Sequence, residues 1–298
     1  MADSISGLRH QIDSATDLAS VVRTMKTLAA SNISHYEQAV TALDDYYRTL
    51  QLGLIACFRE NQAIKHAEIV TDWACTGAVG AVVFGSDQGL VGQFNESLAE
   101  FVSSTFSTMP CEKKIWSVGE RVQTRLADMN LNSMQLFVVP SAIQAITALI
   151  GELLLAIETQ LECGEIGSIY LFHNRPQGVL YQAVSQCLLP LDAVWQTELT
   201  AVRWTTNNLP EIIGGRKQTL KACIREYLFV SLFRCCTQSL ASENASRLAA
   251  MQRAEKNIAE HLEELQRDFH RLRQNAIDAE LFDVISGFEA LVTGFSKS

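Results

Sequence analysis

The longest regular pattern in the chain runs from Arg216 to Ser286, a stretch that contains neither glycine nor proline. Its apolar residues recur at a spacing of about 3.5, which is typical of the seam of a coiled coil. The predicted seam consists of Leu248, Met251, Ile258, Leu262, Leu265, Phe269, Leu272, Ala276 and Ala279. If the helix is continuous, it reaches on the order of 100 Å at the usual rise per residue. Such a helix cannot bury its seam against itself, so the pattern predicts a partner helix.

Charged residues accompany this seam at helical spacing. Oppositely charged side chains stand four positions apart, an arrangement that supports a helix when both lie on its solvent face. The expected outward pairs are Glu243 with Arg247, Lys256 with Glu260 and Glu263 with Arg267.

A partner helix is predicted at the opposite end of the chain, where no glycine or proline lies between Gly7 and Gly53. Its heptad positions are apolar, with Lys26 as the polar exception. They are Ile5, Leu8, Ile12, Ala15, Ala19, Val22, Ala29, Ile33, Tyr36, Val40, Leu43, Tyr47, Leu50 and Leu54. The two patterns predict an antiparallel coiled coil within one chain. The alternative is two separate long helices packed on a globular body.

Between the helices the periodicity changes. Ala78–Phe84 is a continuous run of small apolar residues, which is typical of a buried strand in a parallel sheet. Further strands are predicted at 113–118, 134–139, 166–173 and 179–189, the last antiparallel to its neighbour, with a turn at 174–178. Helices are predicted at 95–107, 120–128 and 141–163, the last opening at Ser141. This alternation predicts an α/β layer with a mostly parallel sheet.

The predicted fold is therefore an α/β protein in which a Rossmann-like body is inserted between long N- and C-terminal helices that form an antiparallel coiled coil. The predicted segments are an N-terminal helix at 1–60, an α/β body at 61–208 and a C-terminal helix at 209–298. The chain has 298 residues, of which 48% are hydrophobic and 19% charged, as in ordinary soluble proteins. We expect no direct membrane insertion, since no continuous apolar run has the length of a span.

Charge and cysteine content exclude several classes of function. The net charge is −9, and the middle of the chain carries most of the acidic excess. Because no basic stripe is present, nucleic acid is not an expected partner. The eight cysteines form no CxxC pair, so we expect reduced thiols in a cytosolic protein and no zinc site.

One glycine-rich loop invites comparison with phosphate-binding loops. Gly85–Gly92 follows the buried strand, but its spacing is G-x-x-x-G-x-x-G and it contains no lysine. The simpler interpretation is a tight turn in which Asp87 accepts hydrogen bonds from the backbone. The six histidines form no nucleophile motif, and we expect no catalytic residue and no cofactor.

Several segments, in order along the chain, resemble the gamma subunits of F-type ATP synthases. The segment from Leu8-Arg9 to Ser31 is similar to the opening helix of that family, and Ser86–Gly92 followed by Asn95 resembles its serine-aspartate-arginine-glycine-leucine loop. Ser239–Arg247 and Arg273–Ile277, the latter followed by Glu280-Leu281, resemble its C-terminal motifs. The resemblance extends over the whole chain.

The chain also departs from the family's pattern. Asn32 stands where the family usually has lysine, Gln88 where it has arginine and Gln93 where it has a second glycine. Ile285–Glu289 replaces an ending richer in glycine and alanine. These departures indicate a divergent branch, such as an alternate ATPase operon.

The resemblance implies a mechanical function. A gamma subunit is the central shaft that couples ion translocation through a membrane ring to ATP synthesis or hydrolysis on a catalytic head. The implied partners are the alpha and beta subunits, the epsilon subunit and the ring of c subunits. The implied location is the cytoplasmic face of the inner (plasma) membrane, in a peripheral part of a membrane complex.

The resemblance also implies which side chains meet the partners. The expected contact residues are Met25, Lys26, Ser86, Asp87, Gln88, Glu243, Arg273 and Gln274. Two alternatives remain open at this stage. One is an α/β nucleotide-binding enzyme with a coiled-coil dimerisation arm, and the other is a structural scaffold without a motor function.

Overall fold

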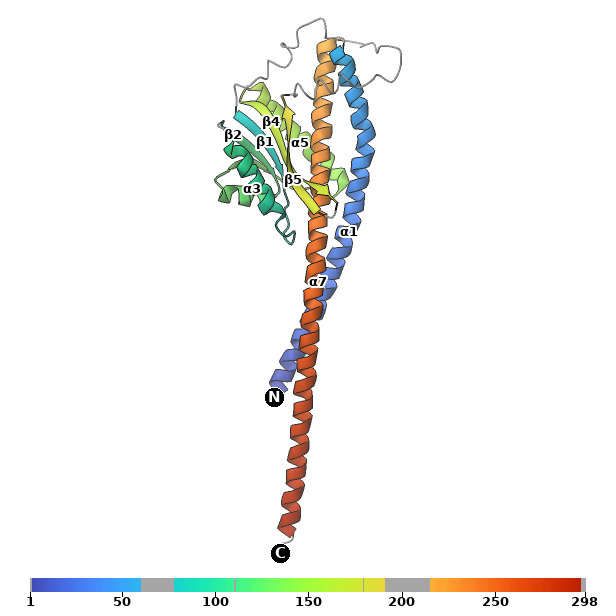
Figure 1. Ribbon diagram of the computed structural model, residues 1–298, viewed down its shortest axis with the longest axis vertical. Coiled ribbons are helices and arrows are strands. Elements are labelled where there is room, and N and C mark those ends of the chain that lie inside the picture. Colours follow the sequence, from blue (N-terminus) through green and yellow to red (C-terminus); the bar gives the residue numbers. More distant parts are fainter. Residues whose placement is uncertain (1, 60–77, 110, 179, 191–214, 296–298) are drawn as a thin grey trace. The chain divides into compact units, whose positions relative to one another are not determined.

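The computed structural model describes residues 2–59, 78–109, 111–178, 180–190 and 215–295. The elements in chain order are α1 (Ala2–Arg59), β1 (Ala78–Phe84), α3 (Phe94–Ser107), β2 (Lys113–Val118), α4 (Glu120–Asp128), β3 (Ser133–Phe137), α5 (Ile143–Glu162), β4 (Ile166–Gln177), β5 (Leu180–Leu189) and α7 (Arg216–Phe295). Figure 1 shows them in space. Residues 60–77 and 191–214 lie outside the described residues.

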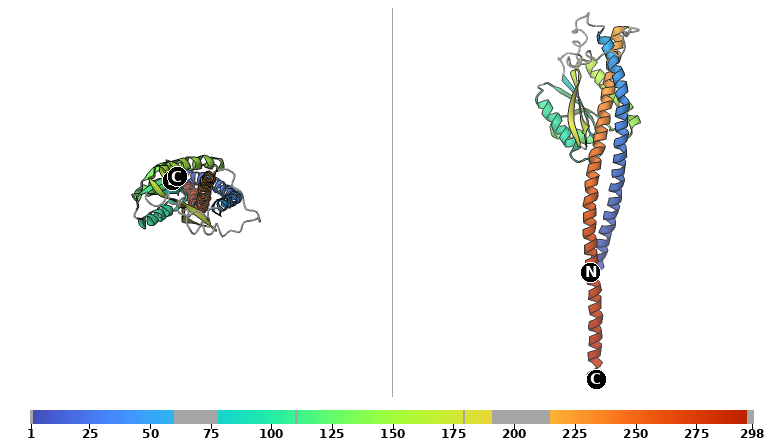
Figure 2. Two further views of the ribbon diagram at one scale, coloured as in Figure 1. Left: turned by 90° about the horizontal axis from the view of Figure 1, so that it is seen from above. Right: turned by 45° about the vertical axis from the view of Figure 1, so that its right-hand side comes forward.

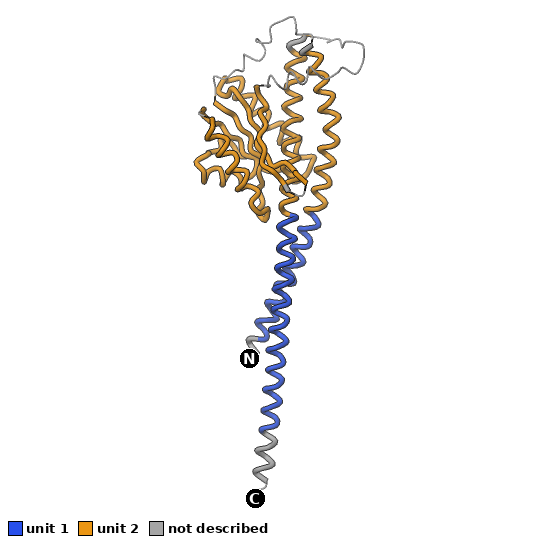
Figure 3. Tube along the Cα trace, in the orientation of Figure 1, with its two compact units in different colours: residues 1–28, 248–298 blue, residues 29–247 orange. Residues whose placement is uncertain are grey.

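The chain divides into two compact units, which Figure 3 colours separately. Unit 1 comprises residues 1–28 and 248–298, and unit 2 comprises residues 29–247. Part of each long helix packs on the sheet and belongs with it in unit 2. The three segments predicted from the sequence stay a prediction.

Unit 2 contains a five-stranded sheet in the order β3-β2-β1-β4-β5. The first four strands are parallel, and β5 is antiparallel to β4. This arrangement confirms the predicted mostly parallel sheet with one antiparallel strand. Strand β1 lies in the centre and is buried along its whole length, as its unbroken apolar run predicts.

Two local predictions are wrong. The residues 174–177, predicted as a turn, continue strand β4, because β4 and β5 pair tightly up to Gln177 and Leu180. The chain reverses at Gly178, whose φ of 62° is the left-handed conformation that glycine tolerates best. Ser141 does not cap helix α5: Ala142 occupies the N-cap position, and no side chain bonds to the free backbone there.

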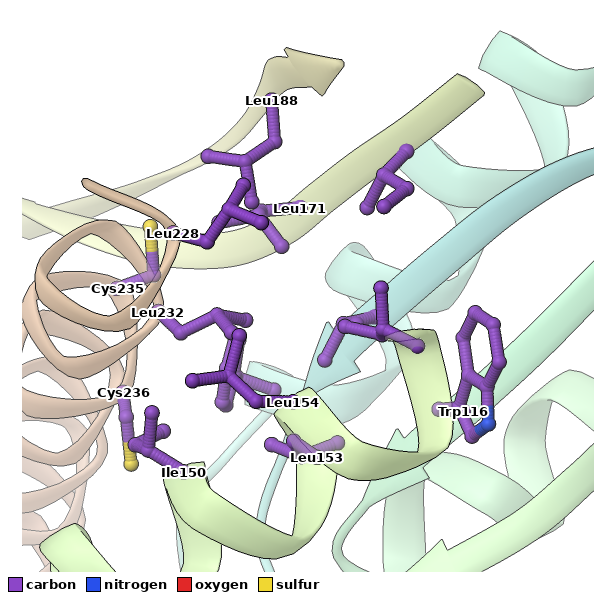
Figure 4. Packing of buried hydrophobic residues seen from close by; sticks show 14 of the residues in the cluster. Trp116, Ile150, Leu153, Leu154, Leu171, Leu188, Leu228, Leu232, Cys235 and Cys236 are labelled. Atoms are coloured by element: carbon purple, nitrogen blue, oxygen red, sulfur yellow. The ribbon is translucent and has the colours of Figure 1, made fainter. Parts of the chain in front are cut away.

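The two faces of the sheet have separate cores, because successive side chains of a strand point to opposite faces. Val79, Ala81 and Val83 pack with helices α3 and α4. Val82 and Phe84 pack with α5 and with parts of both long helices. Figure 4 shows part of this second core, where Leu154 of α5 lies beside Leu232 of α7 and Ile150 of α5 beside Cys236 of α7.

Helix α5 is, by length and composition alone, the one described helix that could cross a membrane. No such segment was expected from the sequence. The helix places Ile146, Ile150, Leu153 and Ile157 in the core of unit 2, as core helices of soluble proteins also do.

Within unit 2 the two long helices run antiparallel, as predicted. Tyr47 and Tyr227 approach with their ring centroids 6.1 Å apart, and Asp44 lies 3.6 Å from Arg234. Further along, Asn32 donates to Asn244 at 3.4 Å. The partner's number falls from 244 to 227 as the number on α1 rises, which is the register of an antiparallel pair. The views in Figures 1 and 2 agree.

In unit 1 the predicted seam is the buried face. Val22, Met251 and Leu265 are 7%, 3% and 8% exposed, and the other predicted seam residues of this unit are half-buried. The helix continues past Ser286, where its regular sequence pattern ends, to Phe295. Of the predicted outward pairs here, Lys256 lies 3.7 Å from Glu260. Arg267 instead donates to the carbonyl of Glu263, at 3.2 Å.

Candidate functional site

The loop after β1 is built as a structural turn. Ser86 is fully buried, its backbone N donates to Asn95 Oδ1 at 3.0 Å, and its hydroxyl accepts from Asn95 Nδ2 at 2.9 Å. The carboxylate of Asp87 accepts from the backbone N of Glu120 and of Val139, both at 2.8 Å. Asp87 thus joins the ends of β1 and β3 to the start of α4, which confirms the simpler interpretation of this loop.

Helix α7 fills the position where α/β folds usually bind ligands. The chain order of the strands reverses between β1 and β4, and ligands of open α/β sheets bind beyond the carboxyl ends of strands at such a point. Here Ser239 donates to the carbonyl of Phe84 and Ser242 to that of Asn174, each at 2.9 Å. Ser246 donates in the same way to Val91 in the loop. The crevice is occupied by the chain's own helix.

A charged pair is buried beside these serines. The carboxylate of Glu243 lies 2.6 Å from the guanidinium of Arg247, and the two side chains are only 6% and 12% exposed. Burial raises the pKa of Glu243, and the charge of Arg247 opposes that rise. The predicted position of this pair on the outward face is therefore wrong, because this part of α7 is covered by the sheet.

Burial also bears on the expected partner contacts. Neither Ser86 nor Glu243 is accessible on the surface of this chain, and both make hydrogen bonds within it. Gln88 is exposed, and Asp87 is half-buried with both carboxylate oxygens occupied. Of this group, Gln88 alone offers a side chain free to meet another subunit.

The polar side chains that anchor α7 to the sheet were not singled out from the sequence. His173 of β4 bonds to Gln238 of α7 at 2.9 Å. Asn174 of β4 donates to the carbonyl of Phe94 in α3 at 3.1 Å, while its own carbonyl accepts from Ser242 of α7. A signal was available on α7, where Ser239, Ser242 and Ser246 recur at the spacing of one helix face. Polar residues on a face that is otherwise apolar mark a buried hydrogen-bonded contact.

The expected contact residues near the N-terminus lie in unit 1. Met25 is half-buried on α1. Lys26 Nζ lies 2.5 Å from Glu255 Oε2, and Arg23 lies 3.5 Å from the other oxygen of the same carboxylate. These cations, Lys26 first, lower the pKa of Glu255. Lys26, the one polar residue predicted at a heptad position of α1, is thus explained by its ion pair with Glu255 of α7.

The expected contact residues near the C-terminus, Arg273 and Gln274, are both exposed on α7. The same part of the helix exposes large apolar side chains. They are Ile277, Leu281, Phe282, Val284 and Ile285, between 45% and 70% exposed. An exposed apolar cluster of this kind marks a surface for another protein.

No catalytic constellation is found in the described parts of the chain. No three His, Cys, Asp or Glu side chains there come close enough to hold a metal ion. The seven cysteines that the structure describes are not in disulfide bonds.

Comparison with known proteins gives a consistent result. The sequence profile of the ATP synthase family matches residues 4–291. The ATP synthase gamma chain of Bdellovibrio bacteriovorus is 23% identical over 294 residues, covering 97% of this chain and 99% of its own length. That of Desulfitobacterium hafniense is 24% identical over 293 residues, with the same two shares.

Solved structures share the fold. A chain of the mitochondrial ATP synthase of Euglena gracilis aligns with a TM-score of 0.64 at 14% identity, covering 99% of this chain and 96% of that one. A chain of the central stalk and c-ring of the Tetrahymena thermophila enzyme aligns with a TM-score of 0.56 at 21% identity, covering 78% and 99%. Fold, motifs and the family profile agree over nearly the whole sequence. The chain therefore belongs to the ATP synthase family, as a gamma subunit.

Proposed function

We propose that this gamma subunit is the rotating shaft that couples ion translocation through a membrane ring to ATP synthesis or hydrolysis on a catalytic head. The observation that carries the proposal is the filled crevice of the sheet. The body that could have bound a nucleotide instead holds helix α7, by the hydroxyls of Ser239 and Ser242. A body fixed to a long helix transmits force to that helix.

The surfaces of the two units support the proposed partners. The exposed cluster around Leu281 and Phe282, next to Arg273 and Gln274, suits the alpha and beta subunits of the head. Met25 and Lys26 are proposed as further contacts with a beta subunit. The epsilon subunit and the c-ring are proposed as partners of the α/β body, on the cytoplasmic side of the membrane.

A rotating shaft can change the state of the catalytic subunits when it makes different contacts with each of them. Three similar catalytic subunits around one shaft meet different faces of it, and a ligand or surface shifts an equilibrium only by its differential affinity for the two states. A shaft with an apolar face and a charged face supplies such a difference.

Co-purification tests the proposal. Tagged full-length chain, co-expressed with the alpha and beta subunits encoded in the same genome, should yield a complex with a three-plus-three head that hydrolyses ATP. The isolated chain should bind no ATP. ATP binding by the isolated chain would favour the alternative of an α/β nucleotide-binding enzyme with a coiled-coil arm, and a chain that never associates with the head would favour a scaffold.

A further inference from the structure

A second feature of unit 2 is a cavity of about 350 Å³ between the β4–β5 hairpin, α1 and α7. Tyr47 of α1, His173 and Arg175 of β4, and Arg234 and Gln238 of α7 contribute to its wall. None of its lining residues is among those proposed above as contacts with the alpha and beta subunits. Its volume is sufficient for a small ligand together with bound water.

The wall of the cavity is positively charged. It contains two guanidinium groups and no carboxylate. Arg175 is exposed and has no acidic partner within salt-bridge distance among the described residues. The guanidinium of Arg234 lies 5.7 Å from the centre of the Tyr47 ring and 3.6 Å from the carboxylate of Asp44. The Nε atom of Arg234 has no hydrogen-bond partner among the described residues. A concentrated positive charge in a chain of net charge −9 is a local arrangement that attracts anions.

His173 completes the polar lining. The side chain is 3% exposed and its Nε2 lies 2.9 Å from Gln238 Oε1. Because an amide oxygen only accepts, Nε2 carries the proton and Nδ1 is left as an acceptor. Nδ1 is buried and has no partner among the described residues. An unpaired buried acceptor is costly, and it is satisfied when a donor or a proton arrives.

We propose that this cavity binds a small oxyanion, such as sulfate or phosphate, between Arg175 and Arg234, and that binding brings a proton to His173 Nδ1. Guanidinium groups bind such oxyanions through charge-assisted hydrogen bonds. A protonated Nδ1 adds one further donor. No bond other than these hydrogen bonds and the N–H bond at Nδ1 is made or broken.

The charged and titratable groups around His173 decide the direction of the pH dependence. Arg175 comes from its own strand, Arg234 and Cys235 from α7 and Tyr47 from α1. Without ligand, burial lowers the pKa of His173 to about 4, the two arginines act in the same direction, and the hydrogen bond that His173 donates to Gln238 opposes them. An anion between the arginines cancels their effect and raises that pKa. Since the bound state takes up a proton, affinity should rise as the pH falls.

Sulfate is the suitable probe, because it keeps two negative charges over the whole range from neutral to mildly acidic pH. Calorimetric titration of the purified full-length chain should show one sulfate bound, more tightly at pH 6 than at pH 8. Sulfate should also raise the thermal unfolding temperature of the chain, because a ligand that binds only the native state stabilises it. Absence of binding at millimolar sulfate would overturn the proposal.

Two variants and a matched control sharpen the experiment. Arg175→Gln should weaken sulfate binding about tenfold or more, the equivalent of one lost charge-assisted contact. His173→Gln should retain binding but lose its pH dependence. Arg225→Gln, an exposed arginine of α7 that pairs with Glu158 at 3.0 Å and lies outside the cavity, should bind sulfate as the unaltered chain does.

The variants also separate the proposal from general charge attraction. Equal weakening by Arg175→Gln and Arg225→Gln would show that sulfate responds only to net charge, and would overturn the site. An unchanged pH dependence in a folded His173→Gln chain would overturn the role of Nδ1. If His173→Gln does not fold, the comparison of Arg175→Gln with Arg225→Gln still decides whether the site exists.

Discussion

Glu243 and Arg247 form a buried charged pair within helix α7. Two opposite charges that leave water together lose hydration, and their attraction compensates only when both stay paired. Asn244 beside them donates to the carbonyl of Leu240 at 2.8 Å and accepts from Asn32. The bond from Asn32 of α1 to Asn244 of α7 specifies one register between the two long helices, which an apolar face alone does not.

Replacing the cation of this pair should be costly. Arg247→Met leaves the Glu243 carboxylate buried without its partner, a change worth about 3–5 kcal/mol. Glu243→Gln should cost less, because burial already raises the pKa of that carboxyl and works against its charged form. Denaturant unfolding of the full-length chains measures both, and equal losses would contradict this order.

The same pair predicts a pH dependence. A carboxyl whose folded pKa is raised gives stability that is fully present below its unfolded pKa and lost as the pH rises through the folded pKa. In Arg247→Met the pKa of Glu243 should rise further, since the opposing charge is gone. The free energy of unfolding should therefore fall more steeply from mildly acidic to neutral pH in this variant than in the unaltered chain.

One glycine in the β1 loop is required by space. A Cβ at Gly85 would lie 2.3 Å from Val122 Cβ and 2.9 Å from Asn95 Oδ1. Both distances are shorter than a side-chain Cβ makes to atoms it is not bonded to. Gly85→Ala should therefore destabilise the chain by at least the ~1–3 kcal/mol of an overpacked core. Gly151→Ala is the control, because a Cβ there meets nothing within 4 Å and alanine favours a helix by about 0.5–1 kcal/mol. Thermal unfolding compares them.

At the scale of elements, the sequence predicted most of the fold. The seam of α7, the buried β1 and the α/β alternation each follow from periodicity, and all are confirmed. The failures lie where a long-range contact decides. Pairing with β5 keeps 174–177 in a strand, and cover by the sheet turns Glu243 and Arg247 inward. The spacing of apolar and charged residues along one segment does not show which distant segment packs against a given face of its helix or strand.

The candidate site was less predictable than the fold. The resemblance directed attention to the segments Ser86–Gln88 and Ser239–Arg247, but not to which side chains within them are exposed. Ser86 and Glu243 are internal, whereas Gln88, Arg273 and Gln274 are on the surface. The cavity beside His173 brings together residues from α1, β4 and α7, so no local motif indicates it.

The continuity of α7 through its seam gives a prediction for the element. Leu265 is 8% exposed on the seam of unit 1. Leu265→Pro removes a helix hydrogen bond and clashes with the preceding turn, at a cost of about 3 kcal/mol or more. The variant should fail to assemble with the catalytic head, as co-purification would show.

Its control isolates the backbone effect. Leu265→Ala keeps the helix and loses only packing, about 2–5 kcal/mol when the site is fully buried and less at a partly open seam. This chain should still assemble. Normal assembly and coupling of Leu265→Pro would instead argue against a continuous helix at this position.

At the scale of the whole molecule, the exposed C-terminal surface predicts a change in activity without a change in stability. Arg273 is exposed and makes no salt bridge with a described residue. Arg273→Ala should leave the unfolding temperature of the chain unchanged and lower ATP turnover of the assembled complex. Unchanged turnover in an intact complex would show that this arginine is not a partner contact.

Met25 gives a complementary prediction, about coupling. It is half-buried next to the Lys26–Glu255 ion pair, and methionine slides past a neighbour without forming a directional bond. Met25→Lys should assemble and hydrolyse ATP but pump ions poorly, because a new charge-assisted bond to an acidic partner must break at each step. Loss of assembly would assign Met25 to the helix seam alone.

The three serines of α7 have a consequence for torsion. Ser239, Ser242 and Ser246 bond to carbonyls at three separate places: the end of β1, β4 and the loop after β1. A helix that turns about its own axis, or slides along it, must break all three bonds together. The three serines therefore lock both the rotation and the axial position of this part of α7 relative to the sheet. Torque on this part of α7 is therefore transmitted to the sheet as shear across its strands, and the helix turns little relative to the sheet.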